Sequence, residues 1–115
     1  MAIKTQHDVL ARMALVPRVM EARGLDVTPS MIDKLENVGD SAGVQILQTI
    51  YLEEIEHVRI GSDWYQHICE ERRLEPKTTF FKLVREHHYG ELKGPFNKEA
   101  RRAAGFNEEE LETLG

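Results

Sequence analysis

The sequence has little cysteine, no long apolar run and no excess of positive charge, and each absence excludes a class of protein. Among 115 residues Cys69 is the only cysteine, so no intramolecular disulfide can form, and a reducing cytoplasm is the expected compartment. No apolar stretch approaches the roughly 20 residues of a membrane-spanning helix, and the N-terminus lacks the layout of a signal peptide. A net charge of −5 argues against general binding to nucleic acids or anionic membranes.

The sequence also lacks the alternating apolar pattern of β-strands and the short motifs of several catalytic classes. No glycine-rich loop has a basic companion for phosphate binding, and Cys69 has no neighbouring base that would mark a covalent nucleophile. What remains is helical spacing along a chain that is 41% apolar and 30% charged, an ordinary globular balance. The length suits a single domain over residues 1–115, and the predicted fold class is all-α.

Helix caps and breakers predict where the helices begin and end. A first helix is expected from Thr5 to Arg23, where Gly24 stops it. Pro17 lies inside this helix and removes a backbone donor, so a kink or bulge is expected there. The other expected helices cover residues 29–37, 41–73, 77–89, 97–104 and 107–114. Gly39 is expected to end the first of these, Asp40 or Ser41 to cap the second, and Asn97 and Asn107 to cap the last two.

The longest predicted helix has a row of positions spaced alternately three and four residues apart. Such spacing is typical of a helix packed in a bundle. This row, which we call the inner seam, consists of Val44, Leu47, Tyr51, Glu54, Val58, Gly61, Tyr65 and Ile68. Glu54 is the exception in an otherwise mostly apolar row. We therefore place the bundle helices in residues 1–73 and a C-terminal helical extension in residues 74–115.

Glu54 and His57 form the most informative pair. Residues three apart project from one face of a helix and can share a metal ion. The spacing alone is weak, because 15 Glu and 5 His in 115 residues give about 0.65 such pairs by chance. The register adds weight, since a carboxylate on a bundle seam is costly unless it is paired, protonated or metal-bound. Two interpretations stay open: a partly buried Glu54–His57 hydrogen bond, and a pair of metal ligands.

Glu21 is the third candidate metal ligand. It follows Pro17 by one turn, and bulged helical turns often accompany functional sites. The alternative is an exposed side chain beside Arg18 in the last turn of the first helix, with no ligand role. If that helix ends near Arg23, Glu21 lies close to its end, whereas Glu54 lies about 14 residues into the long helix. For the two side chains to lie at the same level, the long helix would have to extend beyond the first by roughly 18 Å.

Three segments resemble a bacterial ferritin-like family of unknown function. The first reads Arg-Met-Ala-Leu-Val-Pro-Arg at residues 12–18 and Glu-Ala-Arg-Gly-Leu-Asp-Val-Thr-Pro at residues 21–29. The second is Glu-Glu-Ile-Glu-His-Val at residues 53–58. The third is the ending Gly-Pro-Phe-Asn-Lys-Glu-Ala-Arg at residues 94–101, followed by Ala-Gly-Phe at residues 104–106. The resemblance extends over nearly the whole chain, which looks like the C-terminal half of a full-length member.

The resemblance implies a ferritin-like four-helix bundle with a carboxylate-bridged dinuclear metal site. Such sites take one glutamate from each of two helices and a Glu-x-x-His pair from each of the other two. By that resemblance Glu21 would be the lone glutamate, and Glu54 and His57 would be the paired ligands. The wider superfamily includes oxidases, iron stores and oxygen-activating hydroxylases, one of which modifies tRNA, so tRNA stays among the candidate substrates.

Only two of the four long bundle helices are present, so we expect a half-bundle that a second copy of the chain completes. A homodimer would supply four carboxylates and two imidazoles for two divalent ions, with iron as the expected metal and manganese as the alternative. The expected activity is oxygen-dependent oxidation or hydroxylation of an unknown substrate. The alternatives are an iron-handling protein and a non-catalytic fragment that docks onto a missing N-terminal half. The docking residues of that fragment would be Leu47, Tyr51, Val58 and Tyr65.

Overall fold

The structure is a computed structural model that describes residues 8–87 and 94–114, and every regular element in these ranges is helical. The α-helices are α2 (Val9–Leu15), α3 (Ala22–Asn37), α4 (Ser41–Arg72), α5 (Pro76–Glu86), α6 (Lys98–Ala103) and α7 (Glu108–Leu114), and η1 (Val16–Glu21) is a π-helix. The all-α prediction is confirmed. None of these helices combines the length and the apolar character that crossing a bilayer requires.

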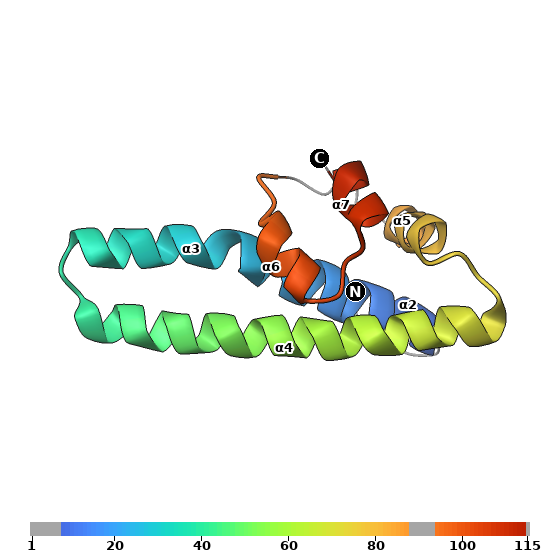
Figure 1. The fold of residues 1–115 in the computed structure, drawn as a ribbon, viewed down its shortest axis with the longest axis horizontal. Coiled ribbons are helices and arrows are strands. Elements are labelled where there is room, and N and C mark those ends of the chain that lie inside the picture. The colour runs from blue at the N-terminus through green and yellow to red at the C-terminus, as the bar shows by residue number, and fades with distance from the viewer. Residues whose placement is uncertain (1–7, 88–93, 115) are drawn as a thin grey trace.

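Two long antiparallel rods form the frame of the molecule. The first rod is α2, η1 and α3 in unbroken succession, and α4 is the second, which returns alongside it (Figure 1). Gly39 connects them with a φ of +78°, a conformation that glycine adopts without strain. Asp40 then caps α4 by accepting a hydrogen bond from the Gly43 amide. The predicted break at Gly39 and the start of the long helix are confirmed.

The first rod does not end at Gly24, and no separate helix begins at Pro29, so both predictions were wrong. Helix α3 runs through the two residues to Asn37. A proline inside a helix leaves the carbonyl group four residues earlier, here that of Leu25, without its usual donor. Asn97 Nδ2 donates to the Leu25 carbonyl oxygen at 3.0 Å. A distant side chain thus supplies the hydrogen bond that Pro29 cannot make.

The bulge expected at Pro17 is present as the π-helix η1. The Pro17 ring is buried against Gly61 of α4, where an added Cβ would lie 2.3 Å from the ring atoms Cβ and Cγ. Only glycine at that position lets the two rods approach so closely. The first rod begins after Asp8, whose carboxylate accepts two hydrogen bonds from amides of the first turn. The predicted cap Thr5 lies outside the described residues.

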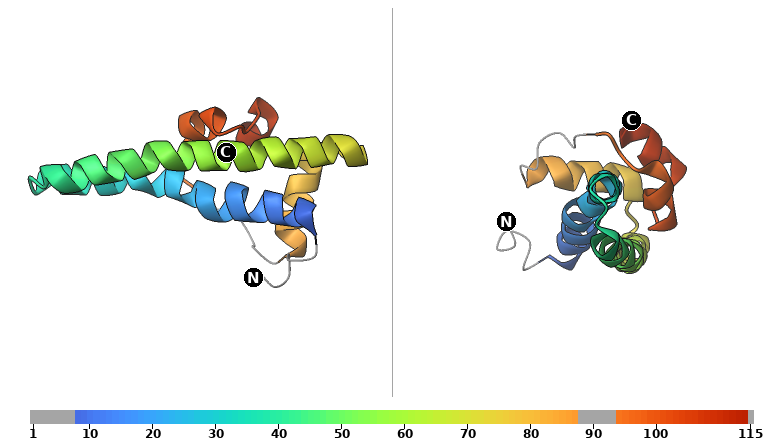
Figure 2. Two further views of the ribbon diagram at one scale, coloured as in Figure 1. Left: turned by 90° about the horizontal axis from the view of Figure 1, so that it is seen from below. Right: turned by 90° about the vertical axis from the view of Figure 1, so that its left-hand side faces the viewer.

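The three C-terminal helices cover one half of this frame. Helix α5 crosses near the end of α4, while α6 and α7 lie over the middle of the molecule (Figures 1 and 2). The caps Asn97 and Asn107 begin α6 and α7, as the sequence predicted. The helix expected at residues 77–89 is α5, and its last two predicted residues lie outside the described ranges. The largest apolar side chains with less than 2% exposure are Leu15, Leu25, Val58, Tyr65, Phe80 and Leu111.

The other half of the frame has no such cover. We call residues 28–50 the arm, because they form the end of α3 and the start of α4, and we call the remaining described residues the body (Figure 1). No residue of the arm is buried. Large apolar side chains are exposed there, with Val38 at 77% and Ile46 at 60%. The molecule thus combines a packed body with a two-helix arm over which none of the described residues forms a third layer.

Candidate metal centre

Glu21 lies in the middle of the first rod and not near a helix end. It is the last residue of η1, and the 16 residues of α3 follow it directly. The long helix therefore does not need to extend beyond the first helix for Glu54 to lie level with Glu21. That overhang was expected only if the first helix ended near Arg23. Arg18 is not beside Glu21 on the surface either, because Arg18 is completely buried and donates hydrogen bonds to Glu110.

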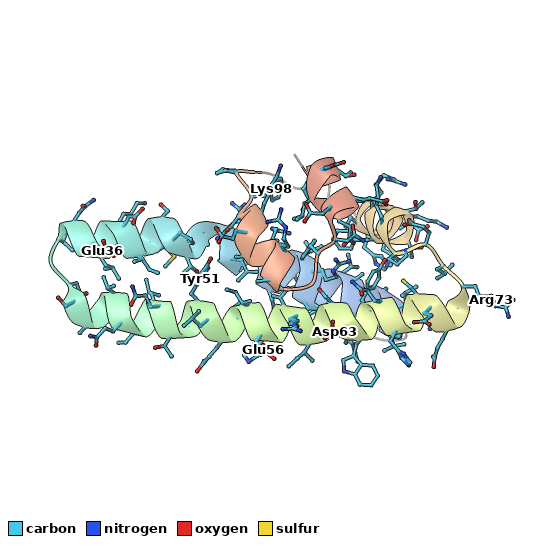
Figure 3. All side chains as sticks on the ribbon, in the orientation of Figure 1. Glu36, Tyr51, Glu56, Asp63, Arg73 and Lys98 are labelled. Carbon is cyan, nitrogen blue, oxygen red and sulfur yellow. The ribbon has the colours of Figure 1, made fainter. Side chains whose placement is uncertain are left out.

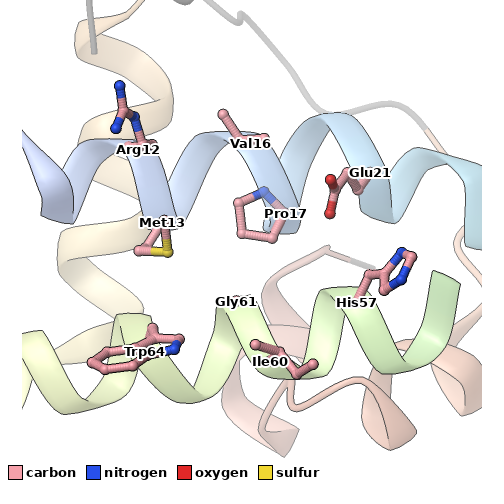
Figure 4. Close-up of a pocket in the computed structure, with 9 residues that line it drawn as sticks. All are labelled: Arg12, Met13, Val16, Pro17, Glu21, His57, Ile60, Gly61 and Trp64. Carbon is pink, nitrogen blue, oxygen red and sulfur yellow. The ribbon is translucent and has the colours of Figure 1, made fainter. Parts of the chain in front are cut away.

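Glu54 and His57 project from α4 toward the first rod. Glu54 is half-buried, and its Cγ lies 3.9 Å from the position that a Cβ would take on Gly24, in the first turn of α3. His57 is exposed and projects into the space between the rods, as does Glu21 from the opposite side (Figure 4). The structure therefore brings the three candidate ligands to one region where η1 and α3 meet α4.

Glu21 and His57 line a groove of about 510 Å³ between η1 and α4 (Figure 4). Its other walls are Arg12, Met13, Val16, Pro17, Ile60, Gly61 and Trp64. The groove is open to solvent, since Ile60 is 49% exposed and Trp64 is 57% exposed. Two of the candidate ligands thus stand in a largely apolar groove that no part of the described chain covers.

The Glu54 carboxyl group is in an unfavourable electrostatic position. Burial raises its pKa, the negative charge of Glu21 raises the pKa further, and His57 acts in the opposite direction. The Oε1 atom of Glu54 is buried and accepts no hydrogen bond, from His57 or from any other donor in the described residues. A buried carboxylate oxygen without a partner is destabilising.

The described residues of one chain do not complete a metal site. Within residues 8–87 and 94–114, no group of three or more His, Cys, Asp or Glu side chains is arranged to hold a metal ion by itself. The donor types nevertheless suit a metal, because two carboxylates and an imidazole lie between the rods and one carboxylate oxygen has no partner among the residues described. We call Glu21, Glu54 and His57 the half-site.

Some of the residues that were predicted to dock onto a partner are buried within this chain. Val58 and Tyr65 have 0% exposure, and Leu47 and Tyr51 are half-buried. Tyr51 points toward α6, where its hydroxyl oxygen accepts a hydrogen bond from Asn97 Nδ2 at 2.7 Å, whereas Glu56 lies on the outer side of α4 (Figure 3). These residues cannot all contact a partner.

The exposed face of α4 carries a second row of positions with the same alternation of three and four residues. We call this row the outer seam, and it consists of Ile46, Ile50, Glu53, His57, Ile60 and Trp64. All of its members are exposed. The spacing was visible in the sequence, but spacing alone does not tell which of two neighbouring rows faces the core.

Two buried ion pairs were not predicted from the sequence. Arg18 pairs with Glu110 at 2.6 Å, and Arg101 pairs with Asp26 at 2.7 Å. No helical spacing rule connects residues so far apart in the chain. The one local signal was the Asn-x-x-Glu sequence that begins at Asn107, a capping pattern that fixes the position of Glu110 on α7.

Comparison with known proteins points to a single family. A family model described as "Protein of unknown function (DUF455)" matches residues 1–112. An uncharacterised protein of Haemophilus influenzae is 45% identical over 114 residues, which is 99% of this chain and 40% of the relative. The chain thus spans about two fifths of the curated relative that it matches, and no solved structure matches it. The chain therefore belongs to the DUF455 family of proteins of unknown function.

Proposed function

We propose that this chain is one half of a ferritin-like protein with a carboxylate-bridged dinuclear metal centre. The observation that supports this best is the half-site, in which a buried oxygen of Glu54, close to Glu21 and His57, has no hydrogen-bond partner in residues 8–87 and 94–114. A metal ion would satisfy this oxygen and offset the repulsion between the two carboxylates. The family resemblance implies the same three residues as ligands.

In this proposal a second copy of the chain supplies the missing ligands. Two half-sites hold four carboxylates and two imidazoles. The carboxylates carry a total charge of about −4, which would be balanced by two divalent ions. The groove that contains Glu21 and His57 opens on the side of the outer seam, so the described part of the chain does not block the approach of a second chain. Without metal the two half-sites would repel each other, and metal binding is therefore expected to strengthen the dimer.

Iron is the expected metal and manganese is the alternative, because both accept mixed carboxylate and imidazole ligands. Bound iron would supply oxygen activation, so the proposed reaction is oxygen-dependent oxidation or hydroxylation. Glu21, Glu54 and His57 would hold the metal. The apolar groove walls, such as Met13 and Ile60, would exclude water once a second chain covers them.

The test is the metal content of the chain after anaerobic loading with Fe(II), measured by elemental analysis together with native mass. The wild type is expected to hold two ions per dimer, and His57→Ala is expected to lose most of them. His67→Ala is the matched control, because His67 lies on the same helix with its side chain 56% exposed and paired with Glu71. Unchanged iron content in His57→Ala would overturn the metal assignment.

A non-catalytic helical interaction module is the second candidate, and the exposed arm favours it. Met31 of α3 and Ile46 and Ile50 of α4 are exposed on two helices over which no described residue forms a third layer. More than half of the relative's length lies outside the match and could supply a covering segment. Light scattering with and without Fe(II) separates the candidates: a dimer strengthened by metal supports the first, and a monomer indifferent to metal supports the second.

A further inference from the structure

Two buried ion pairs attach the C-terminal segment, residues 94–114, to the first rod on either side of Glu21. Arg18 precedes Glu21 by three residues and binds Glu110 of α7. Asp26 follows Glu21 by five residues and binds Arg101 of α6. The C-terminal segment therefore holds the rod at two points, with the π-helix and its candidate ligand between them.

Arg18 is fixed by contacts with three other helices. Its Nη1 and Nη2 atoms donate to the two carboxylate oxygens of Glu110 at 2.7 and 2.6 Å. Its Nε atom donates to the Ser62 hydroxyl of α4 at 3.1 Å. Aromatic rings surround the guanidinium carbon, at centroid distances of 4.2 Å for Phe106, 4.8 Å for Phe80 and 5.0 Å for Tyr65.

Glu110 is held in place by the cap of its own helix. Its amide donates to Asn107 Oδ1 at 2.8 Å, and its Oε1 atom accepts a hydrogen bond from the Asn107 amide at 2.9 Å. This reciprocal arrangement is a capping box. The carboxylate is completely buried and accepts hydrogen bonds from both Asn107 and Arg18.

The second attachment lies just beyond Glu21. Asp26 accepts hydrogen bonds from Arg101 Nε at 2.9 Å and Nη2 at 2.7 Å, and its side chain is 1% exposed. The backbone amide of Asn97 donates to the same carboxylate at 2.8 Å. The Asn97 side chain donates to the Leu25 carbonyl and so allows the helix to continue through Pro29.

We propose that Arg18 and Glu110 are positioning residues, and that the C-terminal segment clamps η1 in the register that presents Glu21 to the groove. This inference rests on the proposed function, in which Glu21 is a metal ligand. A π-helix is rarer than an α-helix and needs surroundings that fix it. If η1 relaxed to an α-helix, the register would shift by one residue and Glu21 would rotate by about 100°.

The character of the ion pair supports a positioning role. A buried ion pair is weak evidence of a contribution to fold stability, because apolar residues of similar volume often replace such pairs without lowering the free energy of unfolding. Such pairs can instead select one conformation, and the Arg18–Glu110 pair selects the one in which η1 lies against α4 and α7. The clamp is therefore expected to act on the geometry of the half-site more than on the stability of the fold.

The test uses the full chain with the double substitution Arg18→Met and Glu110→Leu, which removes the pair without leaving a buried charge. Thermal unfolding should stay close to wild type. Hydrogen exchange of the η1 amides in the metal-free chain should accelerate. Co(II) affinity, followed by visible absorption, should fall by about 10- to 100-fold. Arg102→Gln is the matched control and should change none of the three, because Arg102 forms an exposed pair with Glu108 within the same segment.

A second comparison isolates Glu21. In the wild type, Glu21→Gln should weaken Co(II) binding, whereas in the double variant it should have little further effect, because Glu21 no longer faces the metal. If the double variant does not fold, Arg18→Gln combined with Glu110→Gln, which also removes both charges, takes its place, and the same measurements apply to it.

The outcomes separate the two proposals. If the wild type binds no Co(II), the proposed function is wrong. If hydrogen exchange of the η1 amides is as slow in the double variant as in the wild type, the clamp is wrong. A variant that binds Co(II) as tightly as the wild type and still loses affinity on Glu21→Gln also overturns the positioning role.

Discussion

The body and the arm are built from the same two rods, yet only the body buries its apolar side chains. In the body, α5, α6 and α7 lie over the rods, and Leu25, Val58 and Tyr65 have 0% exposure. In the arm, Met31 and Ile46 of the same rods stay exposed. Two helices alone enclose little volume, so the core depends on the layer that the C-terminal helices add.

The half-site lies at the border between these two regions. His57 directly precedes Val58, the first fully buried residue of α4, and Glu54 lies one helical turn before Val58. The body therefore fixes one side of the half-site, while the other side is open. The proposed second copy would give the arm the layer that it lacks and would complete the ligand set in the same step.

The largest expected difference between the regions comes from truncating one isoleucine in each. Ile68 and Ile46 lie on the same helix, at 8% and 60% exposure. Ile68→Ala should lower the free energy of unfolding by about 2–5 kcal/mol, whereas Ile46→Ala should change it by about 0.5 kcal/mol or less. Urea denaturation of the metal-free monomer measures both. Equal losses would contradict the division into body and arm.

A pair of glycine substitutions has the next largest effect. Gly61→Ala places a Cβ 2.3 Å from the Pro17 ring, and we expect it to cost about 1–3 kcal/mol of unfolding free energy. Gly24→Ala meets Glu54 Cγ at an ordinary 3.9 Å, so the better helix propensity of alanine should stabilise the chain by about 0.5–1 kcal/mol. Thermal unfolding should show opposite signs, and two changes of the same sign would refute the close approach at Pro17.

The smallest predicted effect concerns Glu54 and depends on pH. Because the folded state raises the pKa of Glu54 above its ordinary value, ionising this group costs stability as the pH rises from that value through the folded pKa. Glu54→Gln should therefore be more stable than the metal-free wild type at about pH 7, and the difference should vanish at about pH 4. Unfolding free energies across this range provide the measurement. A variant that is less stable at neutral pH would show that Glu54 has a partner in the folded state.

The features of the fold that depend on neighbouring residues were predictable from the sequence. The cap Asp40 and the turn at Gly39 act within a few residues, and so does the loss of a backbone donor at Pro17. The inner seam was likewise visible as a spacing, and its apolar members from Val58 onward are buried. Local propensity and periodicity decide such features.

The features that depend on distant residues could not be predicted. The helix continues through Pro29 because Asn97, far along the chain, bonds to the Leu25 carbonyl. Arg18 looked like a surface residue because its partner Glu110 is 92 positions away. For the half-site, the position of Glu54 on the inner seam marked it as a candidate ligand. The number of ligands that a single chain brings together depends on tertiary packing, which residue spacing does not determine.

The hydrogen bond from Asn97 to the Leu25 carbonyl also has a consequence for the order of folding during synthesis. During synthesis the N-terminal part of a chain emerges from the ribosome first, so residues 22–37 are exposed long before Asn97 is. Until then the Leu25 carbonyl lacks its protein donor and Asp26 lacks Arg101, and Pro29 is the weakest point of the emerging helix. The direction in which the arm points is therefore fixed late, when the last part of the body docks.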